Sequence, residues 1–257
     1  MIDLHAHILP GLDDGPRDMD ATLALARAAV ASGTRTLAAT SHVDRTFWLM
    51  PEQLADARRD VTHALAEAGI ELKVVQGGEV ATARMPALSD DELRALTLGG
   101  GPYVLLECPF GPARRLEALV ADLLERGFAV LLAHPERSPD LQRDPARLGR
   151  LVDAGALAQV TAGSFAGDFG ETPRQAAERM LAAGWLHVLA SDAHDAVDRG
   201  PDLAVAAGGL QERYAGVAEQ LAWMARDAPA AILAGLPLPE RPRLPLQRRP
   251  ARRLRAW

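Results

Sequence analysis

The chain has 257 residues, of which 48% are hydrophobic and 4% aromatic, a composition that suits one large domain with an aliphatic core. Its net charge is −6, but residues 241–257 carry seven arginines and no acid, which leaves −13 on residues 1–240. This negative charge excludes nucleic acid as a partner of the main body. We expect one domain over residues 1–240, followed by a basic Pro/Arg-rich tail over 241–257.

Seven short apolar runs with β-branched residues alternate with amphipathic helical segments along the chain. The predicted strands are 2–7, 36–42, 72–80, 103–109, 128–135, 156–163 and 187–194. The predicted helices between them include 18–31, 51–68, 113–126, 145–154 and 172–183. This alternation predicts an α/β fold with a parallel sheet and helices outside it.

Side chains of the types that bind metals stand at the carboxyl ends of most of these runs. They are His5, His7, His42, Glu79, Glu107, His134, Asp192 and His194. In a parallel barrel the carboxyl ends of the strands converge on one face, where active sites are built. Mixed nitrogen and oxygen ligands suit manganese, iron or zinc better than calcium. The sequence therefore predicts a metal centre at this face, whereas His63 and His187 fall outside it.

The ordered motifs HAH, TSH, GGE, AHPER and SDAH resemble those of the polymerase and histidinol phosphatase (PHP) superfamily. Within it, the segments MIDLHAHILPGLDDG, HPER, VTAGSFAGDFG and SDAHD are similar to the bacterial manganese-dependent tyrosine-protein phosphatases of the CpsB/CapC family. The resemblance covers roughly residues 1–235. It implies a distorted seven-stranded (βα) TIM-like barrel, the PHP fold.

The resemblance also implies about three divalent ions, manganese first, with iron or zinc as alternatives. One ion would be held by His5, His7, Glu79 and Asp192. Glu79 would bridge to a second ion, whose other ligands would be Glu107 and His134. The third ion would be held by Asp14, His42 and His194, and the sequence leaves Asp13 open as the alternative to Asp14.

Two arginines, Arg137 and Arg199, match the positions where the family binds the phosphate group. A guanidinium group suits this role because it forms bidentate, charge-assisted hydrogen bonds with phosphate oxygens. Taken without the family, each arginine could equally form a surface salt bridge.

The implied reaction is hydrolysis of a phosphomonoester, with phosphotyrosine on a bacterial tyrosine kinase that controls capsular or exopolysaccharide synthesis as the substrate. Clustered divalent cations acidify water and stabilise phosphate oxygens, and a phenol with a pKa of about 10 is a better leaving group than an aliphatic alcohol. A PHP-type small-molecule phosphatase such as histidinol-phosphatase is the alternative. A non-catalytic kinase-binding adaptor is a remote one, because every ligand position is filled here. The sequence indicates no oligomeric state.

The stretch CPFGPAR, from Cys108 to Arg114, fits the C-x5-R loop of cysteine-dependent tyrosine phosphatases. That loop needs successive backbone N–H groups that cradle phosphate and lower the pKa of the thiol. Because Pro109 and Pro112 remove two of these donors, we expect no cysteine nucleophile here.

Two positions depart from the family pattern. Val43 stands where the family has a second histidine, and Ser138 stands where a tyrosine commonly follows HPER. We expect these differences to alter substrate contacts at the rim and to leave the metal ligands unaffected.

The location of the protein is predicted from what the sequence lacks. Its single cysteine allows no intramolecular disulfide and is compatible with a reducing compartment. No stretch reaches the roughly 18 apolar residues of a membrane span, and the first residues do not resemble a signal peptide. We therefore expect a cytoplasmic protein, with the basic tail either solvated or in contact with acidic surfaces.

Overall fold

The fold is seen in a computed structural model that describes residues 1–211, 213–242 and 247–248. The strands in chain order are β1 (Ile2–Ala6), β2 (Thr36–Ala39), β3 (His42–Val43), β4 (Lys73–Val75), β5 (Glu79–Ala81), β6 (Tyr103–Glu107), β7 (Ala129–Ala133), β8 (Leu157–Thr161), β9 (Val188–Ala190), β10 (Tyr214–Ala215) and β11 (Gln247–Arg248). The predicted basic tail over 241–257 lies mostly outside the described residues.

The α-helices are α1 (Met19–Ala31), α2 (Pro51–Glu67), α3 (Asp90–Leu96), α4 (Leu116–Glu125), α5 (Pro139–Arg143), α6 (Ala146–Asp153), α7 (Ala162–Ala166), α8 (Glu171–Ala182), α9 (Val205–Gln211), α10 (Val217–Ala222) and α11 (Ala228–Ala234). Shorter helical turns are η1 (Met85–Ala87), η2 (Leu98–Gly100), η3 (Pro135–Arg137) and η4 (Trp223–Asp227). Local signals set their ends. Asp18 caps α1 by accepting the N–H of Ala21 at 2.9 Å, and Ser89 forms a capping box with Glu92 at the start of α3.

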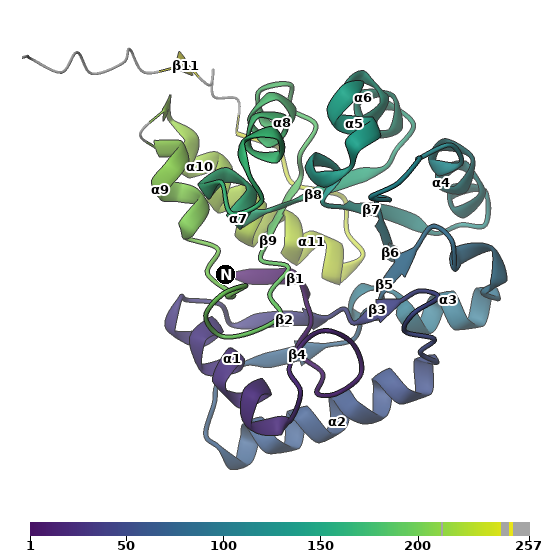
Figure 1. Cartoon of the computed structure of the whole chain (residues 1–257), viewed down its shortest axis with the longest axis vertical. Helices are drawn as coiled ribbons and strands as arrows, with labels where there is room; N and C mark the ends of the chain where they lie inside the picture. Colours follow the sequence, from purple (N-terminus) through teal and green to yellow (C-terminus); the bar gives the residue numbers. More distant parts are fainter. Residues whose placement is uncertain (212, 243–246, 249–257) are drawn as a thin grey trace, which may run out of the picture.

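Strands β1 to β9 pair in parallel and lie inside the ring of helices (Figure 1), whereas β10 pairs antiparallel with β11. One sheet has the order β1-β2-β4 and a larger one has the order β3-β5-β6-β7-β8-β9. A bridge between Ala6 and Ala193 joins β1 to the end of β9, where the N–H of Asp192 also donates to the carbonyl of His5 at 2.8 Å. The predicted parallel α/β architecture is thus confirmed. The predicted distorted seven-stranded barrel is not confirmed, because the hydrogen-bonded strands fall into separate sheets.

The predicted strands 36–42 and 72–80 are each divided between the two sheets, which corrects the prediction of two continuous strands. β2 and β4 pair in the smaller sheet, whereas β3 and β5 pair in the larger one. The two segments approach closely where they change sheets. A Cβ atom at Gly77 would lie 2.9 Å from Thr40 Cγ2, so this crossing requires glycine.

Two apolar clusters fill the interior. The larger lies between strands and helices, since it contains Leu37, Leu106 and Leu132 from the strands together with buried residues of α1 and α4. The smaller is formed by residues of five strands with η2 and α11: Leu4, Ala38, Leu105, Leu131, Ala133, Val188, Ala190, Leu98 and Ile232. The strands therefore curve around this smaller cluster, which we call the inner cluster.

No helix within residues 1–211 and 213–242 is both long and apolar enough to cross a lipid bilayer.

Candidate metal centre

The metal-type side chains singled out in the sequence come together next to the inner cluster, at the carboxyl ends of the strands. Strand parity explains why. Leu105 belongs to the inner cluster, so Glu107, two residues further along β6, continues on the same face. The nine residues concerned are His5, His7, Asp14, His42, Glu79, Glu107, His134, Asp192 and His194.

The first strand reaches this face through an irregularity that the sequence does not reveal. Leu4 packs in the inner cluster, but the pairing of β1 with β2 shifts register between Asp3 and Ala6. This bulge turns the rings of both His5 and His7 toward the centre, where their Nε2 atoms lie 3.4 Å apart. Two imidazole nitrogens that face one point are typical of metal ligands.

The nine residues form four overlapping groups, each able to offer ligand atoms that lie within 4.8 Å of one another. The groups are His7–Asp14–His42–His194, His5–Glu79–His134, His5–His7–Asp192 and His42–Glu79–Glu107. They differ in detail from the three sets implied by the resemblance. Glu107 lies with His42 rather than with His134, and His7 also joins the group of Asp14.

Glu79 stands at the middle of the centre and is fully enclosed. Its Oε1 lies 2.8 Å from His134 Nε2, and its Oε2 lies 2.9 Å from His42 Nδ1 and 3.4 Å from His5 Nε2. Burial would raise the pKa of this carboxyl, but the facing imidazoles hold it well below its usual value. Glu79 belongs to two of the four groups, as a bridging carboxylate would.

The structure distinguishes the two aspartates of the first loop. Asp13 Oδ2 lies 2.7 Å from His7 Nδ1 and accepts the backbone N–H of His42 at 3.0 Å. It therefore orients the His7 ring, whose Nε2 faces the centre. Asp14 Oδ1 instead lies 3.2 Å from His194 Nε2 and 3.4 Å from His42 Nε2. Asp14 is therefore the residue that shares a group with the histidines.

The environment of the centre shifts the pKa values of its imidazoles in both directions. Burial disfavours a charged His7, yet the carboxylates of Asp13 and Asp192 raise its pKa to about 10. Burial and the neighbouring His7 lower the pKa of His194 to about 4. Within the described chain, the buried atoms Glu79 Oε2 and His194 Nε2 face His42 Nδ1 and Asp14 Oδ1, but neither contact has hydrogen-bond geometry. Because buried polar atoms are almost always satisfied, this donor set fits divalent cations.

Two ligand-type residues have an unusual backbone conformation. His134 (φ 35°) and Asp192 (φ 54°) are the non-glycine residues with positive φ in the described part of the chain. This left-handed region is costly for such residues and is concentrated at functional sites. Hydrogen bonds hold both in place, from the His134 N–H to Gln159 Oε1 at 3.3 Å and from the Asp192 N–H to the His5 carbonyl.

Arg137 and Arg199 reach the centre from two different loops and meet at one carboxylate. Arg137 Nη1 donates to Asp192 Oδ2, and Arg199 Nη2 donates to the same oxygen at 2.9 Å. The Arg137 guanidinium also lies over the rings of Phe169, at 4.2 Å, and Phe110, at 5.0 Å. Both arginines therefore form ion pairs with a ligand-type carboxylate at the edge of the centre, and their side chains are 14% and 34% exposed.

Three residues that support the ligands were missed in the sequence. Gln159 Oε1 lies 3.0 Å from His5 Nδ1, which leaves His5 Nε2 facing the centre. Asp3 accepts hydrogen bonds from the N–H and hydroxyl of Ser191 and so ties β1 to the end of β9. A buried Asp and Gln inside apolar strands were the available signal, because such residues are buried only when hydrogen-bonded.

The C-x5-R loop is not a thiolate site. Cys108 is fully buried, and burial together with Glu136, Glu107 and Glu79 raises the pKa of its thiol well above the usual range. A nucleophilic cysteine needs the opposite shift.

The two departures from the family pattern do not lie at the rim, which corrects the expectation that they alter substrate contacts there. Val43 is fully buried in the larger apolar cluster. Ser138 is also buried, and its hydroxyl donates to the carbonyl of Pro109 at 2.9 Å. Of the two histidines set aside, His63 is exposed on α2 and pairs with Glu67 at 3.3 Å.

Comparisons with known proteins agree with this geometry. The family model for capsular polysaccharide synthesis, CpsB/CapC, matches residues 1–234. The tyrosine-protein phosphatase YwqE of Bacillus subtilis is 36% identical over 201 residues, which cover 77% of this chain and 79% of YwqE. The tyrosine-protein phosphatase CpsB of Streptococcus pneumoniae is 28% identical over 222 residues, covering 83% and 91%.

A solved structure gives the same result in three dimensions. It comes from work on YwqE of Bacillus subtilis and CpsB of Streptococcus pneumoniae, described there as unique metal-dependent tyrosine phosphatases. It superposes with a TM-score of 0.85 at 32% identity and covers 97% of this chain and 100% of the other. The chain therefore belongs to the CpsB/CapC capsular polysaccharide synthesis family.

Proposed function

We propose that this protein is a metal-dependent phosphatase that hydrolyses phosphotyrosine in proteins. The observation that carries the proposal is the convergence of nine metal-type side chains with two arginines at one end of the strands. Two relatives, matched over 79% and 91% of their length, are named tyrosine-protein phosphatases. The family description supports a substrate in capsular or exopolysaccharide synthesis, for which we propose a bacterial tyrosine kinase in the cytoplasm.

We further propose that the nine residues hold about three divalent ions, with manganese as the native metal. The overlapping groups, with Glu79 shared between two of them, support a multinuclear centre. Bound ions supply positive charge that acidifies water and stabilises the phosphate oxygens. The contacts between β1 and β9 likewise support a distorted seven-stranded (βα) barrel as the scaffold of the centre.

In this proposal Arg137 and Arg199 bind the non-bridging oxygens of the phosphate. Both already point at Asp192 Oδ2, so a dianionic phosphate that enters beside Asp192 meets two guanidinium groups with fixed orientation. Phe110 is 51% exposed and stacks on the His134 ring at 5.4 Å. The exposed part of its side chain can contact the ring of a phosphotyrosine whose phosphate lies in the centre.

The test compares substrates and metals directly. Protein stripped with EDTA should lose activity, and Mn²⁺ should restore turnover of a phosphotyrosine peptide above that of a phosphoserine peptide and of histidinol phosphate. His194→Ala should lose bound metal by elemental analysis, whereas His63→Ala on the surface of α2 is the matched control. Full activity of metal-free protein would refute the metal mechanism. Faster turnover of histidinol phosphate would assign a small-molecule substrate instead.

A further inference from the structure

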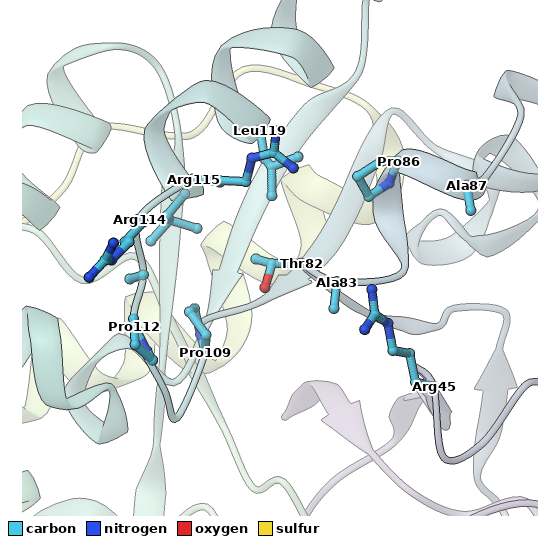
Figure 2. Close-up of a pocket in the computed structure, with 12 residues that line it drawn as sticks. Arg45, Thr82, Ala83, Pro86, Ala87, Pro109, Pro112, Arg114, Arg115 and Leu119 are labelled. Carbon is cyan, nitrogen blue, oxygen red and sulfur yellow. The ribbon is translucent and has the colours of Figure 1, made fainter.

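A pocket of about 550 Å³ opens beside the metal centre, lined by loops that follow three strands (Figure 2). These strands, β3, β5 and β6, carry His42, Glu79 and Glu107, which form one of the four metal-type groups. Its lining residues Arg45, Thr82 and Pro109 follow these ligands by only two or three positions. At about 3.5 Å per residue, the pocket is within about 10 Å of the centre along each loop.

The charged residues that line this pocket are all arginines. Arg45 enters from the loop after β3, and Arg114 and Arg115 enter from the segment after β6 (Figure 2). No acidic residue lines it. None of the three arginines forms an ion pair within the described chain, although other exposed arginines such as Arg59 and Arg94 do. Three unpaired cations in one pocket are notable in a main body with a net charge of −13.

The wall of the pocket is held by packing. The guanidinium of Arg84 lies 3.8 Å from the centre of the Trp48 ring, which connects the loop of Arg45 to the loop after β5. Arg84 is only 3% exposed, whereas Trp48 is 58% exposed, so Trp48 covers the Arg84 guanidinium and joins the two loops. On the other side, Pro109 and Pro112 restrict the backbone that carries Arg114. The arginines are therefore presented on constrained loops.

We propose that this pocket binds an anionic group of the substrate chain, a carboxylate or a second phosphate, one to three residues from the phosphotyrosine in the metal centre. The inference rests on the proposed function, because the phosphotyrosine places the neighbouring residues. A pocket that holds three arginines repels the basic C-terminal tail and attracts an acidic segment. The protein thus selects acidic sequences around its phosphotyrosine.

The test uses metal-loaded, full-length protein and phosphotyrosine peptides of equal length whose flanking positions carry Glu, Ala or Lys. We expect kcat/KM for the Glu peptide to exceed that for the Lys peptide by about three- to tenfold, mainly through KM, since exposed ion pairs are individually weak. The preference should shrink as ionic strength rises. The double variant Arg45→Ala/Arg115→Ala should bring the ratio close to one. Arg27→Ala, which removes an exposed charge on α1, should keep the wild-type ratio.

A fourth peptide with a second phosphotyrosine in place of Glu separates the two sources of negative charge. For this peptide and for the Glu peptide, kcat/KM of the wild type is divided by kcat/KM of the double variant. A larger quotient for the doubly phosphorylated peptide assigns the pocket to phosphate, and a larger quotient for the Glu peptide assigns it to carboxylate. Equal kcat/KM for the Glu and Lys peptides, or a preference that survives in the double variant, overturns the inference. Failure of the wild-type enzyme to hydrolyse any of the peptides would overturn the proposed function instead.

Discussion

Gln159 offers a sharp test of how the metal centre is oriented. Its Oε1 lies 3.0 Å from His5 Nδ1 and accepts the N–H of His134 at 3.3 Å, so one side chain orients two of the proposed ligands. Gln159→Leu keeps the size of the side chain but removes both interactions. We expect metal affinity to fall about 10- to 100-fold, as is typical when the hydrogen-bond partner of a ligand is lost.

The same substitution should also lower stability. It leaves two buried donors unpaired, each at about 1–3 kcal/mol. It also removes Gln159 Nε2, a buried atom without a partner in the described structure, which offsets part of this cost. A net loss of about 1–4 kcal/mol in the free energy of unfolding is expected.

Calorimetric titration of Mn²⁺ into stripped protein measures the affinity, and urea unfolding of the stripped protein measures the stability. Gln175→Leu is the matched control, because Gln175 is exposed on α8 and bonds only to Glu171 among the described residues. If Gln159→Leu binds Mn²⁺ as tightly as the wild type, His5 is not a ligand held by Gln159, and the reasoning about the centre is wrong.

Three further predictions follow from other contacts. Arg137→Lys keeps a charge but loses the planar guanidinium that lies against Phe110 and Phe169. We therefore expect kcat/KM for a phosphotyrosine peptide to fall about 10- to 100-fold while the metal content stays unchanged. Wild-type kinetics would exclude Arg137 from phosphate binding. Cys108→Ala should retain kcat within about threefold, because the buried thiol has a raised pKa, and an inactive but folded variant would instead favour a cysteine mechanism. Burial and Arg241 lower the pKa of His187 to about 4, and its Nδ1 accepts the N–H of Ala158 at 3.2 Å. The unfolded chain therefore binds more protons between pH of about 6.5 and 4, and this contribution to stability, up to about 3 kcal/mol, is lost as the pH falls through that window. His187→Asn, which preserves the acceptor, should show a shallower loss of unfolding free energy in acid, and an identical pH dependence would contradict the assignment.

The sequence determined the fold class and which residues form the candidate metal centre, because both depend on short-range patterns. Apolar runs that alternate with amphipathic segments predict parallel strands with helices outside. Parity within a strand then carries the last residue of a run onto the face of the inner cluster, as it does for Glu107. Parity also predicts that His5 and His7 share a face, whereas the register shift in β1 decides which face that is.

Only the tertiary structure decided how these residues are arranged around one another. The register shift in β1, the division of residues 36–42 and 72–80 between two sheets, and the distinct places of Asp13 and Asp14 all depend on distant partners. Gln159 contacts His5 across 154 positions of sequence, and Ser191 contacts Asp3 across 188. Hydrogen bonds between segments so far apart leave no periodic trace in the chain, because their geometry exists only after the strands have packed.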